Sequence, residues 1–285
     1  MANLEHIDIL YEGADAWNNW RKESPQIKPD ISKCDLYKVS RYWMFAHISI
    51  TSKELNFSET DMREVRFKGM NEFIFDFTHS NLSNVDLSQR KLRWANLNNA
   101  DLSYAQLRGT NLFRAKLIDA KLTNTNLTHA NLIEAELNNA ELHYANLNKA
   151  KLCRAKLIKS NLYKANLSGA KLGNSDMRNA DLRGADLSNT NLYSVNIQKA
   201  YFDEETIFPQ DFNPLNAGMI YLSVDYENSN LIEKLLINKK EKKYINPPPR
   251  PGQVEFRENV RKAYDNKCAI SGCGIEEVLQ QIAGN

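Results

Sequence analysis

The residues with reactive side chains are few and scattered. The chain of 285 residues has five histidines, at positions 6, 47, 79, 129 and 143, and four cysteines, Cys34, Cys153, Cys268 and Cys273. Cys268 and Cys273 could supply half of a zinc site, but no second pair follows them, which favours small buried thiols. A Gly-rich phosphate loop and a Ser-centred nucleophile elbow are also lacking. We therefore expect no catalytic residue, no metal and no cofactor.

Composition limits the class of protein. The cysteines are too few and too scattered for a disulfide framework, which indicates a reducing compartment. The sequence does not open with a basic region followed by an apolar run, and no eighteen uninterrupted apolar residues occur in it. Hydrophobic residues make up 42% of the chain and its formal net charge is +2. We expect a folded cytoplasmic protein that does not associate with a membrane.

A period of five residues runs through the middle of the chain. From Phe57 to Phe202, every fifth residue forms a column of thirty positions, of which twenty-nine are apolar and Glu72 is not. Two residues earlier lies a second column, which between Ala95 and Ala200 holds Ala at sixteen positions and Thr, Ser or Val at six. This period excludes an amphipathic helix, whereas residues two apart share one face of an extended chain. Each repeat therefore predicts a short extended side followed by a corner, for which the remaining polar residues are suited.

The repeats Ala-Asn-Leu-Asn-Asn at 95–99 and Ala-Asp-Leu-Arg-Gly at 180–184 show the pattern in full. They resemble the motif of the pentapeptide-repeat family, and the resemblance covers about half of the chain. It implies an all-β solenoid, namely a right-handed quadrilateral β-helix of pentapeptide repeats with four repeats in each coil of twenty residues. In that fold the leucines fill the axis, the small residues let the walls approach, and residues twenty apart stack on one face.

The beginning of the rod departs from this pattern. The small-residue column holds larger side chains there, so we expect wider or distorted first coils; these residues are Leu55, Val65, Met70, Phe75 and, later, Arg90. Ile31 and Leu36 look like an earlier pair of repeats that is out of phase, with 37–55 as an inserted excursion. Before them, helical spacing of apolar residues predicts a short helix that covers the open end of the rod and its unpaired strand edges; these residues are Ile7, Leu10, Ala14 and Trp17.

Net charge bears on one role known in this family. Some relatives imitate duplex DNA with an acidic rod and block a topoisomerase. Residues 57–202 of this chain contain twenty Lys or Arg and fourteen Asp or Glu, a formal net charge of +6. The rod has the wrong sign for a DNA mimic, so we do not expect topoisomerase inhibition of that kind.

Two outward surfaces of the rod are candidates for a functional role. The first is an apolar stripe, which could contact another subunit, a protein partner or the chain's own tail; it consists of Phe113, Ile133, Cys153 and Tyr193, flanked on the next face by Ile118 and Ile158. The second is a basic patch within about one coil, which could be solvated charge or a weak nucleic-acid contact; it consists of Lys149, Lys151, Arg154, Lys156, Lys159 and Lys164.

The end of the sequence has a different character. The Gly-Gln pair before Phe256, the Ala-Tyr pair at 263–264, Cys-Ala-Ile-Ser-Gly at 268–272 and Glu-Val-Leu at 277–279 resemble the opening of HNH-type endonuclease domains. In that family the next element carries the histidines that hold a divalent metal and activate water. No histidine occurs here after His143, so the resemblance implies a truncated or degenerate nuclease segment without cleavage activity.

These features divide the chain into four expected regions: an N-terminal cap at 1–56, the β-helix at 57–202, a linker rich in Pro and Lys towards its end at 203–252, and a small helix-containing, HNH-like tail at 253–285. The leading hypothesis is a non-enzymatic scaffold or interaction module with an unidentified protein partner, or a second copy of the chain. The alternative is a protein associated with a nuclease or bound to nucleic acid.

Overall fold

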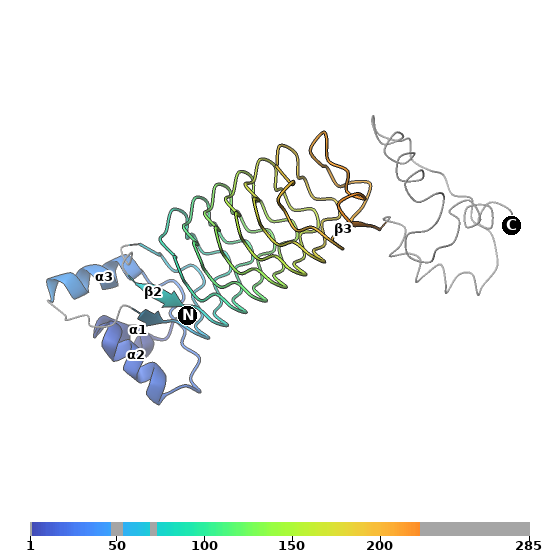
Figure 1. Cartoon of the computed structure of the whole chain (residues 1–285). Helices are drawn as coiled ribbons and strands as arrows, with labels where there is room; N and C mark the ends of the chain where they lie inside the picture. The colour runs from blue at the N-terminus through green and yellow to red at the C-terminus, as the bar shows by residue number, and fades with distance from the viewer. Residues whose placement is uncertain (1, 47–53, 69–72, 223–285) are drawn as a thin grey trace, which may run out of the picture.

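The computed structural model describes residues 2–46, 54–68 and 73–222. Figure 1 shows a rod of stacked coils with helices gathered at its N-terminal end. The helices are α1 (Leu4–Tyr11), α2 (Ala14–Glu23) and α3 (Leu36–Phe45). The strands are β1 (Glu54–Asn56) and β2 (Ile74–Asp76), which pair in parallel near the helices, and β3 (Tyr201–Phe202) and β4 (Ile220–Tyr221), which pair in parallel at the other end. The HNH-like tail, its helix and most of the expected linker lie outside the described residues.

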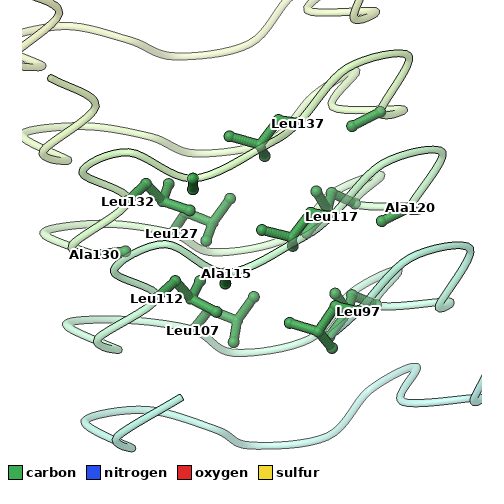
Figure 2. Packing of buried hydrophobic residues seen from close by; sticks show 14 of the residues in the cluster. Leu97, Leu107, Leu112, Ala115, Leu117, Ala120, Leu127, Ala130, Leu132 and Leu137 are labelled. Atoms are coloured by element: carbon green, nitrogen blue, oxygen red, sulfur yellow. The ribbon is translucent and has the colours of Figure 1, made fainter. Parts of the chain in front are cut away.

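The coil of the rod is twenty residues long. Parallel bridges join residues twenty apart from coil to coil, as in Asn96, Lys116, Glu136 and Lys156. The leucines of the five-residue column and the alanines before them are buried, and Figure 2 shows equivalent leucines stacked above one another along the axis. Burying one leucine stabilises a fold by about 1.5 to 3 kcal/mol. The column therefore explains both the shape of the rod and much of its stability.

A tight turn forms nearly all of the corners that the structure describes. The carbonyl of a central leucine accepts a hydrogen bond from the amide three residues on, as from Ala95 to Leu92 at 3.2 Å. The residue before that amide has positive φ, for example 59° at Trp94 and 65° at Gly109. Positive φ at this single position is what a type II turn requires. Because the amide of the same residue also bonds to the next coil, as Trp94 does to the Phe113 carbonyl at 2.9 Å, stacking compensates the strained conformation.

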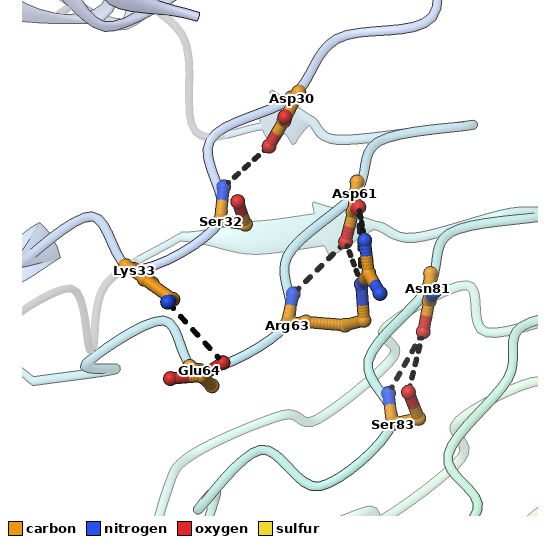
Figure 3. Close-up of polar contacts among 8 residues, drawn as sticks. All are labelled: Asp30, Ser32, Lys33, Asp61, Arg63, Glu64, Asn81 and Ser83. Carbon is orange, nitrogen blue, oxygen red and sulfur yellow. Dashed lines mark hydrogen bonds and ion pairs between the residues drawn. The ribbon is translucent and has the colours of Figure 1, made fainter. Parts of the chain in front are cut away.

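The frequent Asn or Asp before each leucine has a local cause. Its side-chain oxygen accepts a hydrogen bond from the amide two residues on, which fixes the start of the turn. Figure 3 shows this contact in three successive coils, from Ser32 to Asp30 at 2.9 Å, from Arg63 to Asp61 at 3.2 Å and from Ser83 to Asn81 at 3.2 Å. The same motif therefore recurs on one face as the chain winds around the axis.

Aromatic side chains fill the first coils. Phe75 occupies the small-residue column and is buried against Phe57 and Phe77, with near-parallel rings whose centroids lie 6.3 and 5.0 Å away. Leu55 and Val65 are buried in the same column. The larger residues at these positions thus point inward and fill this end of the rod, where alanines stand in later coils.

The first coil includes Ile31 and Leu36, which the sequence indicated as an early, out-of-phase pair of repeats. Asp30 pairs with Asp61, and Asp35 pairs with Arg66, so Ile31 and Leu36 are buried in the coil beneath the main column. Each pair is separated by thirty-one residues in place of twenty, because eleven extra residues, including most of α3, leave the coil and return to it. Residues 1–56 therefore combine a cap with part of the solenoid.

Helix α2 covers the open edge of β1. The indole of Trp17 donates to the Asn56 carbonyl, and the Asn18 side chain donates to the Glu54 carbonyl at 2.8 Å and accepts from the Asn56 amide at 3.0 Å. Arg21 donates to the Ser58 carbonyl at 3.2 Å. The expected helical cap is present, as two helices joined at Gly13 with φ of 122°. The side chains of α2 thus form hydrogen bonds with backbone groups of β1 that no neighbouring strand pairs on this side.

Stacking continues past Phe202, where the sequence predicted a linker. Ile207 pairs with Asp186, twenty-one residues earlier, and Ile220 pairs with Tyr201, nineteen residues earlier. The Ile207 side chain is exposed, because it takes the outward position that Asp186 has one coil earlier, and Thr206 takes the buried small-residue position of Ala185. This slip by one residue ends the regular column at Phe202, and residues 203–222 complete a further, irregular coil.

Candidate functional site: the outer faces of the rod

Every fourth repeat lies on the same face of the rod, so the surface consists of stacked columns. We call one of these the basic face; it is made of the repeats 90–94, 110–114, 130–134, 150–154, 170–174 and 190–194. Each repeat on it presents three positions outward, namely the residue before the central leucine and the two residues after it. The predicted apolar stripe belongs to this face, except for its two flanking isoleucines.

The structure brings three of the stripe residues together. Phe113, Ile133 and Cys153 lie in adjacent coils, linked by the hydrogen bonds that their carbonyls accept from Trp94, Arg114 and Glu134. All three side chains are half-buried. Ile118 and Ile158 are also half-buried but lie on the adjoining face and two coils apart. The predicted stripe is thus a short apolar column of three residues, and Ile118 and Ile158 are separate from it.

Tyr193 does not continue this strip. Gly173 occupies the intervening coil, and the ladder breaks beyond it, because the Asn174 amide bonds to the Ser194 carbonyl instead of that of Tyr193. The Tyr193 side chain is 88% exposed, in contrast to the half-buried Cys153. The interpretation of Tyr193 as a stripe residue was wrong, since a local change of register lifts it away from the wall.

The predicted basic patch is distributed around the rod. Lys149, Lys151, Lys156 and Lys164 each stand on a different face, so they cannot contact one flat ligand together. Three of the six residues also contact carboxylates: Arg154 lies 3.2 Å from Glu134, Lys156 lies 2.8 Å from Glu136 and Lys164 lies 3.4 Å from Glu205. The six cations form a ring around the axis, and only Lys151 and Arg154 belong to the basic face.

An arginine and aromatic cluster at the N-terminal end of the basic face was missed by the sequence reasoning. The Arg93 guanidinium lies 4.5 Å from the centre of the Trp94 ring and 5.2 Å from that of Phe113. Arg114 lies 5.0 Å from the same Phe113 ring. Trp94 is 44% exposed. The available signal was the spacing, because Arg93 and Phe113 are twenty residues apart and so must be stacked.

Glu134 links two of the arginines on this face. It accepts from Arg114 Nε at 2.7 Å and from Arg154 at 3.2 Å, each one coil away. These hydrogen bonds, led by that from Arg114, hold the pKa of the Glu134 carboxyl below its usual value. Glu134 therefore stays ionised and is compensated by two cations.

The described residues hold no group of three or more His, Cys, Asp or Glu side chains that could bind a metal ion. His79, His129 and His143 stand on three different faces of the rod. No helix in the part of the chain that the structure describes is long and apolar enough to cross a membrane.

Comparisons with known proteins agree with this architecture. The family model for pentapeptide repeats, with eight copies of the repeat, matches residues 91–128, 120–158 and 160–198. A solved pentapeptide repeat protein from Nostoc PCC 7120, alr5209, is 35% identical; the match covers 39% of this chain and 84% of that one, with a TM-score of 0.23. No curated protein sequence matches the chain.

Two further solved structures are similar at lower identity. HetL, a pentapeptide repeat protein involved in heterocyst differentiation regulation from the cyanobacterium Nostoc sp. strain PCC 7120, is 24% identical over 68% of this chain and 83% of its own, with a TM-score of 0.34. A trypsin-treated variant of QnrB1, a plasmid-mediated fluoroquinolone resistance protein, is 16% identical over 66% of this chain and 90% of its own, with a TM-score of 0.42. The repeat, its twenty-residue coil and the family match together place this chain in the pentapeptide-repeat family, and its rod is a right-handed quadrilateral β-helix.

Proposed function

We propose that this protein is a non-enzymatic interaction module whose rod presents a fixed array of side chains to a protein partner. The observation that supports this most is the cluster of Arg93, Trp94 and Phe113 beside the half-buried Ile133. Tryptophan and arginine are the residue types that dominate binding energy at protein interfaces. The backbone ladder fixes the main chain at Trp94 and Phe113, so little backbone entropy is lost there on binding.

The test compares two double variants of the full chain. Phe113→Ser/Ile133→Ser changes the basic face, whereas Thr123→Ser/His143→Ser changes the matching positions on the opposite face. Both variants are first checked for wild-type melting and then used, with the wild type, to capture proteins from the source cells. A partner, or a second copy of the chain, that is lost only with the first variant supports the proposal. Equal capture by all three proteins refutes this surface.

A nucleic-acid role is the second candidate, because cations outnumber carboxylates on the basic face. The HNH-like segment at 250–279 lies outside the described residues. Incubation of the full chain with duplex DNA and Mg²⁺ or Mn²⁺ separates the two functions. Metal-dependent cleavage would replace the interaction module with a nuclease, whereas intact DNA is the outcome that we expect.

A further inference from the structure

Positive charge is concentrated on one face of the rod. Between residues 90 and 199 the outward positions of the basic face carry six Lys or Arg and one carboxylate, whereas those of the other three faces together carry ten Lys or Arg and seven Asp or Glu. Lys91, Arg93, Lys151 and Lys171 are all exposed on it. The electrostatic attraction of the rod for an anionic partner therefore has a direction.

The carboxylate on this face offsets only part of that attraction. Glu134 lies between Arg114 and Arg154 and accepts hydrogen bonds from both. A cationic group on a partner would have to displace one of these arginines to reach it. The face thus selects against basic partners as well as attracting acidic ones.

The two aromatic rings at the N-terminal end of the face, Trp94 and Phe113, lie against the protein's own cations. Arg93 lies over Trp94 and Phe113, and Arg114 lies over Phe113. Proteins that bind single-stranded nucleic acid instead leave aromatic faces open, so that bases can stack on them. A guanidinium stacked on a ring keeps its N–H groups directed outward in its plane, where they can form paired hydrogen bonds with a carboxylate. This geometry favours carboxylates over bases.

Resting on the proposed function, we propose that the basic face binds an acidic segment of another protein, with carboxylates on Arg93 and on Lys151 and an apolar side chain between them on Ile133. The two cations are three coils apart, which corresponds to about 14 Å at a strand-like spacing of about 4.8 Å. An extended segment spans this distance with about four residues. The partner is therefore expected to carry two acidic groups separated by a short apolar stretch.

The chain's own tail fits this requirement less well as a whole. Residues 223–285 contain ten Lys or Arg and nine Asp or Glu. The stretch at 223–233, with Asp225, Glu227 and Glu233 and no cation, has the required sign and separated acidic groups, whereas 268–285, also without a cation, carries only the adjacent Glu276 and Glu277. The experiment must therefore distinguish this stretch from a separate protein.

The test uses a fluorescent synthetic peptide in which two Asp-Glu pairs flank Leu-Phe, and its binding to the full chain is measured by anisotropy. The basic-face variant is Lys91→Gln/Arg93→Gln/Lys151→Gln. The control, Arg108→Gln/Lys116→Gln/Lys149→Gln, loses the same charge from exposed positions on other faces. We expect the first variant to bind about tenfold more weakly or worse, the control to bind like the wild type, and wild-type binding to weaken with salt.

Four results would overturn the inference. The first is equally weakened peptide binding in both variants, and the second is no peptide binding to the wild type. The third is tighter binding of oligothymidine than of the peptide. The fourth is tighter peptide binding by the variant Asp225→Asn/Glu227→Gln/Glu233→Gln, which would show that the chain's own tail occupies the face. The oligothymidine result would also overturn the proposed function. The first two results would overturn only the acidic partner, and the capture experiment with Phe113→Ser/Ile133→Ser would still decide the proposed function.

Discussion

Replacing Leu132 with Lys tests the inward assignment of the leucine column most directly. Leu132 is fully buried, and its amide donates to the Lys151 carbonyl at 2.7 Å. The change removes about 1.5 to 3 kcal/mol of hydrophobic stabilisation. It also places an ammonium group in the axis, where a buried charge without a partner costs several kcal/mol more. The total is comparable with the whole stability of many domains, about 5 to 15 kcal/mol.

The adjacent substitution Asn131→Lys is the matched control. The Asn131 side chain accepts from the Ile133 amide at 3.3 Å and donates to Asn111 at 3.3 Å, and both contacts are partly exposed. Lysine already occupies the equivalent position one coil later, at Lys151. We therefore expect a loss of about 1 kcal/mol or less.

Thermal melting followed by circular dichroism, together with amide hydrogen exchange, measures the difference. Because each coil of a solenoid contacts only its neighbours, Leu132→Lys should first abolish protection around Leu112, Leu132 and Leu152 while the capped first coil remains protected. Similar melting temperatures for the two variants, or a uniform loss of protection along the rod, would refute the reasoning.

Three further predictions follow from the cap, the cysteines and the ion ladder. Asn18→Ala removes the side chain that pairs with the β1 edge, so the free energy of unfolding, measured by denaturant melting, should fall by about 1 to 3 kcal/mol. The exposed edge should also increase aggregation, measured by size-exclusion chromatography. Burial raises the pKa of the Cys34 thiol to about 11, so below that pH Cys34 should resist alkylation while the half-exposed Cys153 reacts, as measured by mass spectrometry. Because the thiol ionises at lower pH in the unfolded chain than in the folded protein, the free energy of unfolding should fall as the pH rises from about 9 to about 11. This fall should be present in the wild type and absent in Cys34→Ala. The pKa of Glu134 measured by NMR should lie below its ordinary value and rise in Arg114→Gln, and as pH falls through that lowered pKa the ladder should lose its contribution to stability.

The regular part of the rod could be predicted because its rule is short. One apolar residue in five, with a small residue two positions before it, specifies an inward side and a corner, and the structure buries both columns from Ala95 to Ala185. Helical spacing near Trp17 likewise predicted the cap. In each case a local pattern and the global packing require the same placement, so no information beyond the sequence was needed.

Other features depend on geometry that a periodic pattern does not contain. Ile31 was recognised as part of an early repeat, but its stacking partner in the next coil could not be predicted, because the eleven inserted residues shift the spacing from twenty to thirty-one. Tyr193 was assigned to the wall by counting, but the ladder there slips to Ser194. The contact of Arg93 with two rings depends on side-chain conformation as well as on position.

The distribution of charge is different, because it was present in the sequence and was obscured by averaging. A net charge of +6 over residues 57–202 excludes an acidic mimic but does not say where a partner would bind. Once the coil length is known to be twenty residues, each charged residue has a face, and the excess of cations collects on the one that carries Trp94 and Phe113. Net charge changes the rate of encounter with every anion, whereas a one-sided charge with fixed aromatic contacts discriminates between partners. Removing charge from the other three faces should therefore leave the choice of partner unchanged.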